Sequence, residues 1–206
     1  RPLESSNCVS VEEQIFALEE SLVRAKVPYK IFGGLKFFDR KEIKDILGYL
    51  RLLVNPADNQ AFQRVVNTPP RGIGAQAVQE IIQESQSRGV PYLEAALEVA
   101  STNKSVRKFV ELIADFKLEM GRVSLGALIG IVIERSEYGP KLAAMKDPAA
   151  HSRIENLQEL ESLGRTMERE GVATDTIIKD FLDRISLTSS ADMPANESGV
   201  ETGEAK

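Results

Sequence analysis

Asn67-Thr-Pro-Pro-Arg-Gly-Ile-Gly-Ala75 is the stretch that best indicates how this chain folds. The Pro69-Pro70 pair cannot continue a preceding helix, because proline lacks the amide hydrogen and its ring clashes with the previous turn. Gly72 and Gly74 have no Cβ atom, so they can take positive φ and let another backbone come close. Ile73 between them can insert into the apolar space between the flanking helices. The segment therefore predicts a short loop that joins two helices.

This loop is followed by a predicted helix that begins at Ala75, and the first amide groups of a helix have no partner within it. They carry the positive end of the helix dipole, so a helix start favours anions. Arg71 adds a positive charge and Thr68 a hydroxyl donor. The pattern is typical of a helix-hairpin-helix contact with a phosphate backbone, which recognises position rather than base sequence. The alternative is a tight turn with no ligand, which glycine spacing alone favours.

A second stretch, Tyr29-Lys-Ile-Phe-Gly-Gly-Leu-Lys-Phe-Phe-Asp-Arg-Lys-Glu-Ile-Lys-Asp45, combines a predicted strand, a glycine turn, an aromatic pair and a basic helix start. Residues 24–51 hold eight Lys or Arg against three acids, although the whole chain carries a formal charge of -5. Such a local patch is what a phosphate backbone would feel, because salt screens charges beyond about 8–10 Å. Arg40, Lys41 and Lys44 either face phosphates or are solvated at the helix start, where cations oppose the helix dipole.

Two pairs in this second stretch have alternative interpretations. The Gly33-Gly34 pair is interpreted as a hinge rather than a phosphate cradle, because no Gly-x-Gly-x-x-Gly pattern accompanies it. Phe37 and Phe38 are expected to pack in the core, the alternative being that they stack on bases.

Helical spacing of apolar residues dominates the chain. A single short strand is predicted at residues 29–32. The helices are predicted at roughly residues 10–25, 39–54, 58–66, 75–89, 91–100, 106–120, 125–135, 141–145, 152–169 and 175–187.

Start and end signals accompany these helices. Asp58 and Thr174 are predicted to cap helix starts, and Gly89 to close a helix. Three capping boxes, each a Ser or Asp followed three residues later by Glu, are predicted at Ser10 with Glu13, Asp39 with Glu42, and Ser152 with Glu155.

The predicted fold class is mainly α, a multi-helix accessory domain with a short α/β edge. A lone strand leaves backbone groups unpaired, so it should belong to a sheet whose other strands lie elsewhere. We therefore predict a partial α/β segment at residues 1–35, a helical domain at 36–188, and a flexible acidic tail or linker at 189–206, where bulky apolar residues are almost absent.

Composition excludes several functions. The 206 residues, 42% of them apolar, can bury a core, but Cys8 and His151 are the only residues of their types. They predict neither a disulfide, nor a zinc site, nor a catalytic dyad or triad, and they favour a reducing, cytoplasmic location. The longest apolar run, at residues 125–133, is far shorter than the roughly 20 residues of a membrane span, so no membrane is expected as a partner. Its Gly126-x-x-x-Gly130 spacing predicts a buried helix with close neighbours.

The two stretches together resemble UvrD/Rep/PcrA-type superfamily 1 ATP-dependent DNA helicases. Residues 27–45 are similar to the segment where such enzymes pass from subdomain 2A into 2B, and residues 152–157 to a later element of 2B. The likeness spans roughly residues 15–188. The loop motif of subdomain 2B is matched by Thr68, Pro69, Arg71, Gly72, Ile73 and Gly74, with Pro70 at the variable place.

This resemblance implies a duplex-DNA-binding, regulatory domain that pivots about Gly33, Gly34 and the 188–206 linker. Its partners would be double-stranded DNA near a single-strand junction and the other helicase domains. No G-x-x-x-x-G-K-[ST] loop occurs, so no cofactor and no catalytic residue are expected here; ATP and Mg²⁺ would act elsewhere in the parent hydrolase. The implied DNA-binding residues are Thr68, Arg71, Gly72, Ile73, Gly74, Arg40, Lys41 and Lys44.

The alternative function is a protein-docking module that recruits the helicase to DNA repair or transcription proteins. Exposed apolar or acidic helix faces would then matter more than the basic patch.

Overall fold

The computed structural model describes residues 37–145, 147–168 and 171–190, with the backbone alone for 187–190. All regular elements in these ranges are α-helices, which confirms the mainly α prediction. The predicted helix at 10–25, the strand at 29–32, the Gly33-Gly34 pair and the tail from 191 lie outside the described residues. The helices are α2 (Lys41–Val54), α3 (Asn59–Val65), α4 (Ala75–Arg88), α5 (Tyr92–Val99), α6 (Lys104–Met120), α7 (Leu125–Arg135), α8 (Tyr138–Ala143), α9 (Pro148–Thr166) and α10 (Thr174–Ser190).

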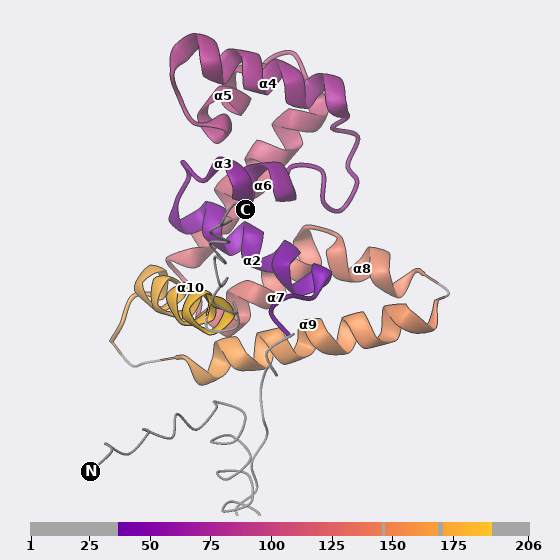
Figure 1. Cartoon of the computed structure of the whole chain (residues 1–206), viewed down its shortest axis with the longest axis vertical. Coiled ribbons are helices and arrows are strands. Elements are labelled where there is room, and N and C mark those ends of the chain that lie inside the picture. The colour runs from indigo at the N-terminus through magenta and orange to yellow at the C-terminus, as the bar shows by residue number, and fades with distance from the viewer. Residues whose placement is uncertain (1–36, 146, 169–170, 191–206) are drawn as a thin grey trace, which may run out of the picture. The chain divides into compact units, whose positions relative to one another are not determined.

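Helix α2 lies at the centre of the packing. It contacts α3, α6, α7, α9 and α10, while α4 pairs with α5 and α9 runs along α7 and α8 (Figure 1). Most of its side chains are buried, and Tyr49 packs edge-to-face on Phe116 with ring centroids 5.9 Å apart. Each fully buried large apolar side chain contributes about 1.5–3 kcal/mol. No helix in the described ranges is both long and apolar enough to cross a membrane.

A buried polar cluster joins α2 to three other helices. Asp45 is buried; its carboxylate accepts a hydrogen bond from Tyr138 Oη at 2.7 Å and pairs with Arg64 Nε at 2.9 Å. Glu42 accepts from Asn156 Nδ2 at 2.6 Å. Burial, and then the bond to Asp45, raise the pKa of Tyr138 above its usual value, so this phenol stays neutral. Because every acid here has a partner, the cluster fixes how α3, α8 and α9 sit against α2.

Helices α7 and α9 cross through two glycines. A Cβ atom on Gly126 would lie 2.9 Å from the backbone nitrogen of Arg165, and one on Gly164 would lie 3.0 Å from the Cα atom of Gly126. Both glycines are buried. The two backbones therefore touch, which confirms the expected buried helix with close neighbours.

The capping box expected at Asp39 and Glu42 is wrong. No side chain caps the start of α2; instead Asp39 pairs with Lys44 at 2.6 Å, and Glu42 is drawn into the buried cluster. Glu42 lies in the first turn of α2, but its side chain accepts from a residue of another helix, so a tertiary contact overrides the local cap.

Two further helix starts also differ from prediction. Helix α9 begins at Pro148 rather than at Ser152, because Asp147 accepts a hydrogen bond from the amide of Ala149 at 2.9 Å and proline is favourable in the first turn. Thr174 is the first residue of α10, and its hydroxyl donates to the carbonyl of Val123 at 2.7 Å. Helix α10 reaches Ser190, three residues beyond the predicted end, and α8 begins three residues before its predicted start.

Other predicted signals are confirmed. Asp58 caps α3 by accepting from the amide of Ala61 at 2.8 Å, and Gly89 ends α4 in the left-handed conformation with φ 66°. Helix α4 begins at Ala75, as the loop pattern predicts. Phe37 is 3% exposed and belongs to the core, which confirms the packing interpretation for this residue.

Candidate nucleic-acid interface

Buried side chains anchor the loop between α3 and α4, and Ile73 lies at its glycine end. Ile73 is 1% exposed and inserts into the core, as predicted. Asn67 holds the turn from inside, because its Oδ1 accepts from the amides of Arg71 at 2.9 Å and Ile73 at 3.3 Å. Gly72 has φ +81°, a conformation that favours glycine, whereas Gly74 has φ -79° and ψ 178°, which any residue adopts. Of the two glycines, only Gly72 uses the positive φ that the sequence allows.

The outer edge of this loop is open. A Cβ atom on Gly74 would have no heavy atom within 4 Å, and one on Gly72 would meet only Ser105 Oγ at 3.3 Å. Both glycines are exposed, no side chain caps the start of α4, and its first turn holds no acidic residue. Among the described residues, the first amides of α4 therefore have no side-chain cap and no acidic side chain in their own turn.

Arg71 is largely engaged inside the loop. Its Nη2 donates to the Thr68 carbonyl at 2.8 Å and to Tyr49 Oη, and its Nε donates to the Pro69 carbonyl at 3.3 Å. The guanidinium carbon also lies 5.4 Å from the centroid of the Phe109 ring. Arginine has five N–H donors, and the bonds above use only those on Nε and Nη2. The two donors on Nη1 have no hydrogen bond among the described residues. Arg71 thus holds the loop in shape and keeps one edge for another acceptor.

Tyr49 supports the same corner from α2. Its hydroxyl donates to the Thr68 carbonyl at 2.5 Å. Burial raises the pKa of Tyr49 to about 12, although the nearby Arg71 charge opposes that rise. The phenol therefore keeps its proton at neutral pH and remains a donor. Nothing in the loop motif indicated Tyr49, which lies 19 residues before Thr68.

A pocket of about 380 Å³ opens on the proline side of the loop, beside Thr68 and the Pro69-Pro70 pair. Its rim carries Lys41 of α2, Lys141 of α8 and Arg153 of α9. Lys141 Nζ donates to the carbonyl of Pro70 at 2.8 Å, which fixes α8 to the loop. The two acids that line this pocket belong to the buried cluster and are paired there, and Lys141 also pairs with the exposed Glu137 at 2.9 Å, so the rim keeps the charges of Lys41 and Arg153. We call this arrangement the basic rim.

Sequence reasoning missed Lys141 and Arg153. They lie about a hundred residues from Lys41 and join it only through the packing of α8 and α9. Arg153 does fall within the 152–157 block, so the resemblance of that block was the one available signal. The sequence gives no signal that Lys141 lies near the loop.

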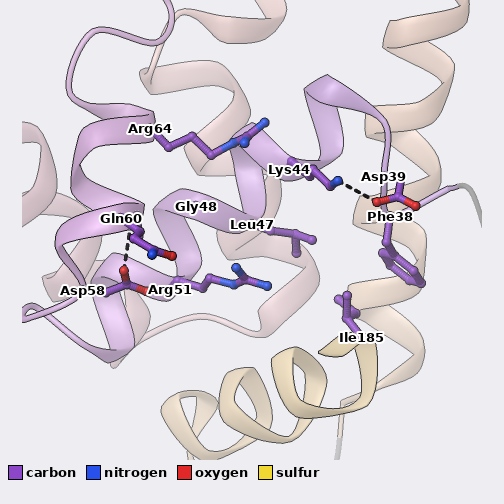
Figure 2. Close-up of a pocket in the computed structure, with 11 residues that line it drawn as sticks. Phe38, Asp39, Lys44, Leu47, Gly48, Arg51, Asp58, Gln60, Arg64 and Ile185 are labelled. Carbon is purple, nitrogen blue, oxygen red and sulfur yellow. Dashed lines mark hydrogen bonds and ion pairs between the residues drawn. The ribbon is translucent and has the colours of Figure 1, made fainter. Parts of the chain in front are cut away.

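Of the three cations predicted near the start of α2, only Lys41 lies at the loop. Arg40 donates to Asn156 Oδ1 and lies 5.4 Å from the centroid of the Phe37 ring. Lys44 turns toward Asp39 and lines a different pocket (Figure 2). In the described part of the chain no three metal-ligating side chains come together, and His151 is exposed on α9.

These features define a class: a helical domain that presents a glycine loop and an uncapped helix start beside lysine and arginine side chains. The sequence matches the family model of the UvrD-like helicase C-terminal domain over residues 8–201. The chain therefore belongs to the UvrD-like helicase family.

Curated relatives agree with this membership. The chain is 37% identical over 210 residues to the ATP-dependent DNA helicase UvrD1 of Mycobacterium tuberculosis (strain ATCC 25618 / H37Rv), which covers 90% of this chain and 27% of that protein. It is 36% identical over 186 residues to the ATP-dependent DNA helicase PcrA of Leuconostoc citreum, covering 85% and 25%. PcrA of Bacillus subtilis (strain 168) is 34% identical over 181 residues, covering 85% and 24%. The chain spans about a quarter of the length of these relatives.

Proposed function

We propose that this chain is the helical accessory domain of an ATP-dependent DNA helicase, and that it binds duplex DNA near a single-strand junction. ATP and Mg²⁺ would act in other domains of the parent enzyme. The family match and the similarity to ATP-dependent DNA helicases support the helicase assignment. The DNA contact is supported by the geometry of the loop.

The observation that carries the proposal is the open edge of the Gly72–Gly74 segment. An added Cβ atom at Gly74 would touch nothing, so the missing side chain serves no packing purpose inside the domain. What the absence leaves is free access to the amides at the start of α4. A phosphate group fits such a site, because several N–H donors and the helix dipole point at the same anion.

The basic rim extends this contact. Lys41, Lys141 and Arg153 come from three helices and lie around the same loop corner. A polyanion that reaches the helix start would meet them as well, and each neutralised phosphate releases counterions. Thr68 lies between the two features, and its side chain can donate to a phosphate oxygen. Arg71 and Ile73 would act by holding the loop in shape.

The role of the domain would be positional and regulatory. Pivoting about the Gly33-Gly34 pair and the 188–206 linker would move the grip on the duplex relative to the other domains, and so gate unwinding. Arg40 and Lys44 would add to this loop contact only through the surrounding positive field, since neither lines the pocket beside the loop.

A salt titration tests the proposal. The 206-residue chain is titrated with a labelled hairpin duplex that carries a single-stranded tail, at rising salt. About three phosphate contacts would weaken wild-type binding roughly 40-fold between about 50 and about 200 mM salt. We expect Gly72→Ala/Gly74→Ala to bind at least about tenfold more weakly at low salt, because the added methyl groups stand on the approach to the helix start.

Gly89→Ala is the matched control, because Gly89 also has positive φ and an open Cβ position but lies at the other end of α4. It should lose stability without losing affinity. Equal, salt-insensitive binding by wild type and the double variant would overturn the proposal. A folded chain with no duplex affinity at all would favour the protein-docking alternative.

A further inference from the structure

A second pocket, of about 280 Å³, lies between α2, α3 and α10 (Figure 2), and it shares no lining residue with the pocket of the basic rim. Three basic side chains line it: Lys44 and Arg51 of α2 and Arg64 of α3. Two acids, Asp39 and Asp58, line it as well. Leu47, Gly48, Ala61, Ile185 and part of Phe38 supply the apolar wall. We call it the α2–α3 pocket.

Both acids of this pocket already have partners. Asp58 caps α3 through its bond from the amide of Ala61 at 2.8 Å. Asp39 pairs with Lys44 at 2.6 Å, and their side chains are 59% and 45% exposed. An exposed pair of this kind is weak and exchanges readily with other ions. The acids therefore do not hold the two arginines.

Arg64 is held in place by a buried charge. Its Nε pairs with Asp45 Oδ1 at 2.9 Å, and that carboxylate is only 3% exposed. The stem of Arg64 lies across α2 because Gly48 has no side chain: a Cβ there would come within 3.3 Å of Arg64 Cδ. Beyond this ion pair with Asp45, no hydrogen bond from the terminal nitrogens Nη1 and Nη2 is found among the described residues. The guanidinium is thus fixed in position with its outer edge free.

Arg51 stands in the last turn of α2 and is exposed, and no ion pair is found for it in the described ranges. Figure 2 shows it extending from α2 along the pocket, with Arg64 above it and Lys44 turned toward Asp39. Two guanidinium groups from different helices therefore line one small concave site. Each has free donors in the planar arrangement that matches phosphate oxygens.

We propose that the α2–α3 pocket binds a phosphate group, held by Arg51 and by the terminal nitrogens of Arg64. Lys44 would exchange Asp39 for the phosphate and complete the site as a third positive charge. The phosphate can come from a nucleic-acid strand that runs along α2 or from a free nucleotide. This site is separate from the loop contact, so it does not depend on the proposed function.

The experiment uses the 206-residue chain labelled with ¹⁵N. Inorganic phosphate is added against chloride at constant ionic strength, and the arginine Nε–Hε signals are followed. We expect the Arg64 signal to shift with a saturating curve. Arg51→Gln should weaken phosphate binding about tenfold, because it removes one of the two guanidinium groups. Arg51→Lys keeps the positive charge and should retain part of the affinity. Arg122→Gln is the matched control, since Arg122 is exposed on the α6–α7 turn.

Two further arms distinguish the source of the phosphate. A short thymidine oligonucleotide whose affinity falls with Arg51→Gln identifies a nucleic-acid strand as the ligand. A nucleotide triphosphate that competes with inorganic phosphate, with no effect of Arg51→Gln on the oligonucleotide, identifies a free nucleotide. The proposal is overturned if the Arg64 signal does not shift in the wild type. It is also overturned if Arg51→Gln binds phosphate as the wild type does, or if Arg122→Gln loses as much affinity.

Discussion

Glycine serves opposite purposes in two regions of this domain. At the crossing of α7 and α9, a Cβ atom on Gly126 or Gly164 would meet backbone at 2.9–3.1 Å. At the loop before α4, a Cβ atom on Gly74 would meet nothing within 4 Å. At the crossing, neighbouring atoms of the protein occupy the space that a glycine side chain would need. At the loop, that space is empty.

The difference separates stability from binding. Where the gap is filled by a neighbouring helix, glycine supports the packing of the domain. Where the gap is empty, glycine leaves room for something outside the chain, and the nearby helix start and basic rim favour an anion. Substitutions in the two regions should therefore change different measurements.

The largest expected effect on stability is at the crossing. Gly126→Ala places a methyl group against the backbone of α9, and overpacking of this kind costs about 2–3 kcal/mol. The gain in helix propensity of roughly 1 kcal/mol offsets only part of it. Urea denaturation measures the loss, and duplex affinity of the folded protein should be unchanged. An unaltered midpoint would show that the two backbones are not in contact and that glycine is not needed there for packing.

Gly72→Ala should have the next largest effect. Its φ of +81° costs an L-residue about 1–2 kcal/mol, and the methyl group would also press on Ser105 Oγ. Gly72→Asn sharpens this test, because asparagine tolerates the left-handed conformation better than alanine. Thermal melts of both variants should rank wild type above Asn and Asn above Ala. The reverse order would mean that backbone conformation is not what selects glycine here.

Tyr49→Phe tests the inner side of the loop. It removes the hydroxyl that donates to the Thr68 carbonyl and accepts from Arg71. The expected loss in the free energy of unfolding is about 1 kcal/mol. The pKa of Tyr49 is raised to about 12 in the fold against 10.0 normally, so its contribution is complete below about pH 10 and is lost as pH rises toward 12.

The stability difference between wild type and Tyr49→Phe should therefore shrink in that alkaline window. Urea denaturation at about pH 9 and about pH 11.5 measures the change. A difference that stays constant between the two would show that the phenol is not desolvated in the way its burial implies.

Gly74→Ala should have the smallest effect on stability. Its φ and ψ suit any residue and its Cβ position is open, so only the weaker cap and the stiffer unfolded chain act, each within about 1 kcal/mol and in opposite directions. Circular dichroism melts should superimpose on the wild type. A large shift in the melting temperature would place Gly74 with the packing glycines.

The sequence predicted the parts of this domain that depend on near neighbours. The start of α4, the buried Ile73, the cap at Asp58 and the end at Gly89 all follow from local patterns. The capping box predicted at Asp39 does not form, because the Glu42 side chain accepts a hydrogen bond from Asn156, more than a hundred residues away.

The same limit explains the site. The loop could be predicted because the residues that form it are consecutive in the sequence. The basic rim could not, because Lys141 and Arg153 reach the loop only through the tertiary packing of α8 and α9. The inward direction of Arg71 was also hidden, since its main partner, Tyr49, belongs to another helix.

Gly74→Glu, with Gln86→Glu as control, tests whether DNA phosphate binds at the start of α4. Both place one negative charge on the surface of α4, and the control lies about 18 Å further along the helix, beyond the reach of screened charges. We predict unchanged melting for both, at least about a tenfold loss of hairpin-duplex affinity for Gly74→Glu, and wild-type affinity for Gln86→Glu. Wild-type affinity in Gly74→Glu, or an equal loss in both variants, would contradict the claim that DNA phosphate binds at the start of α4.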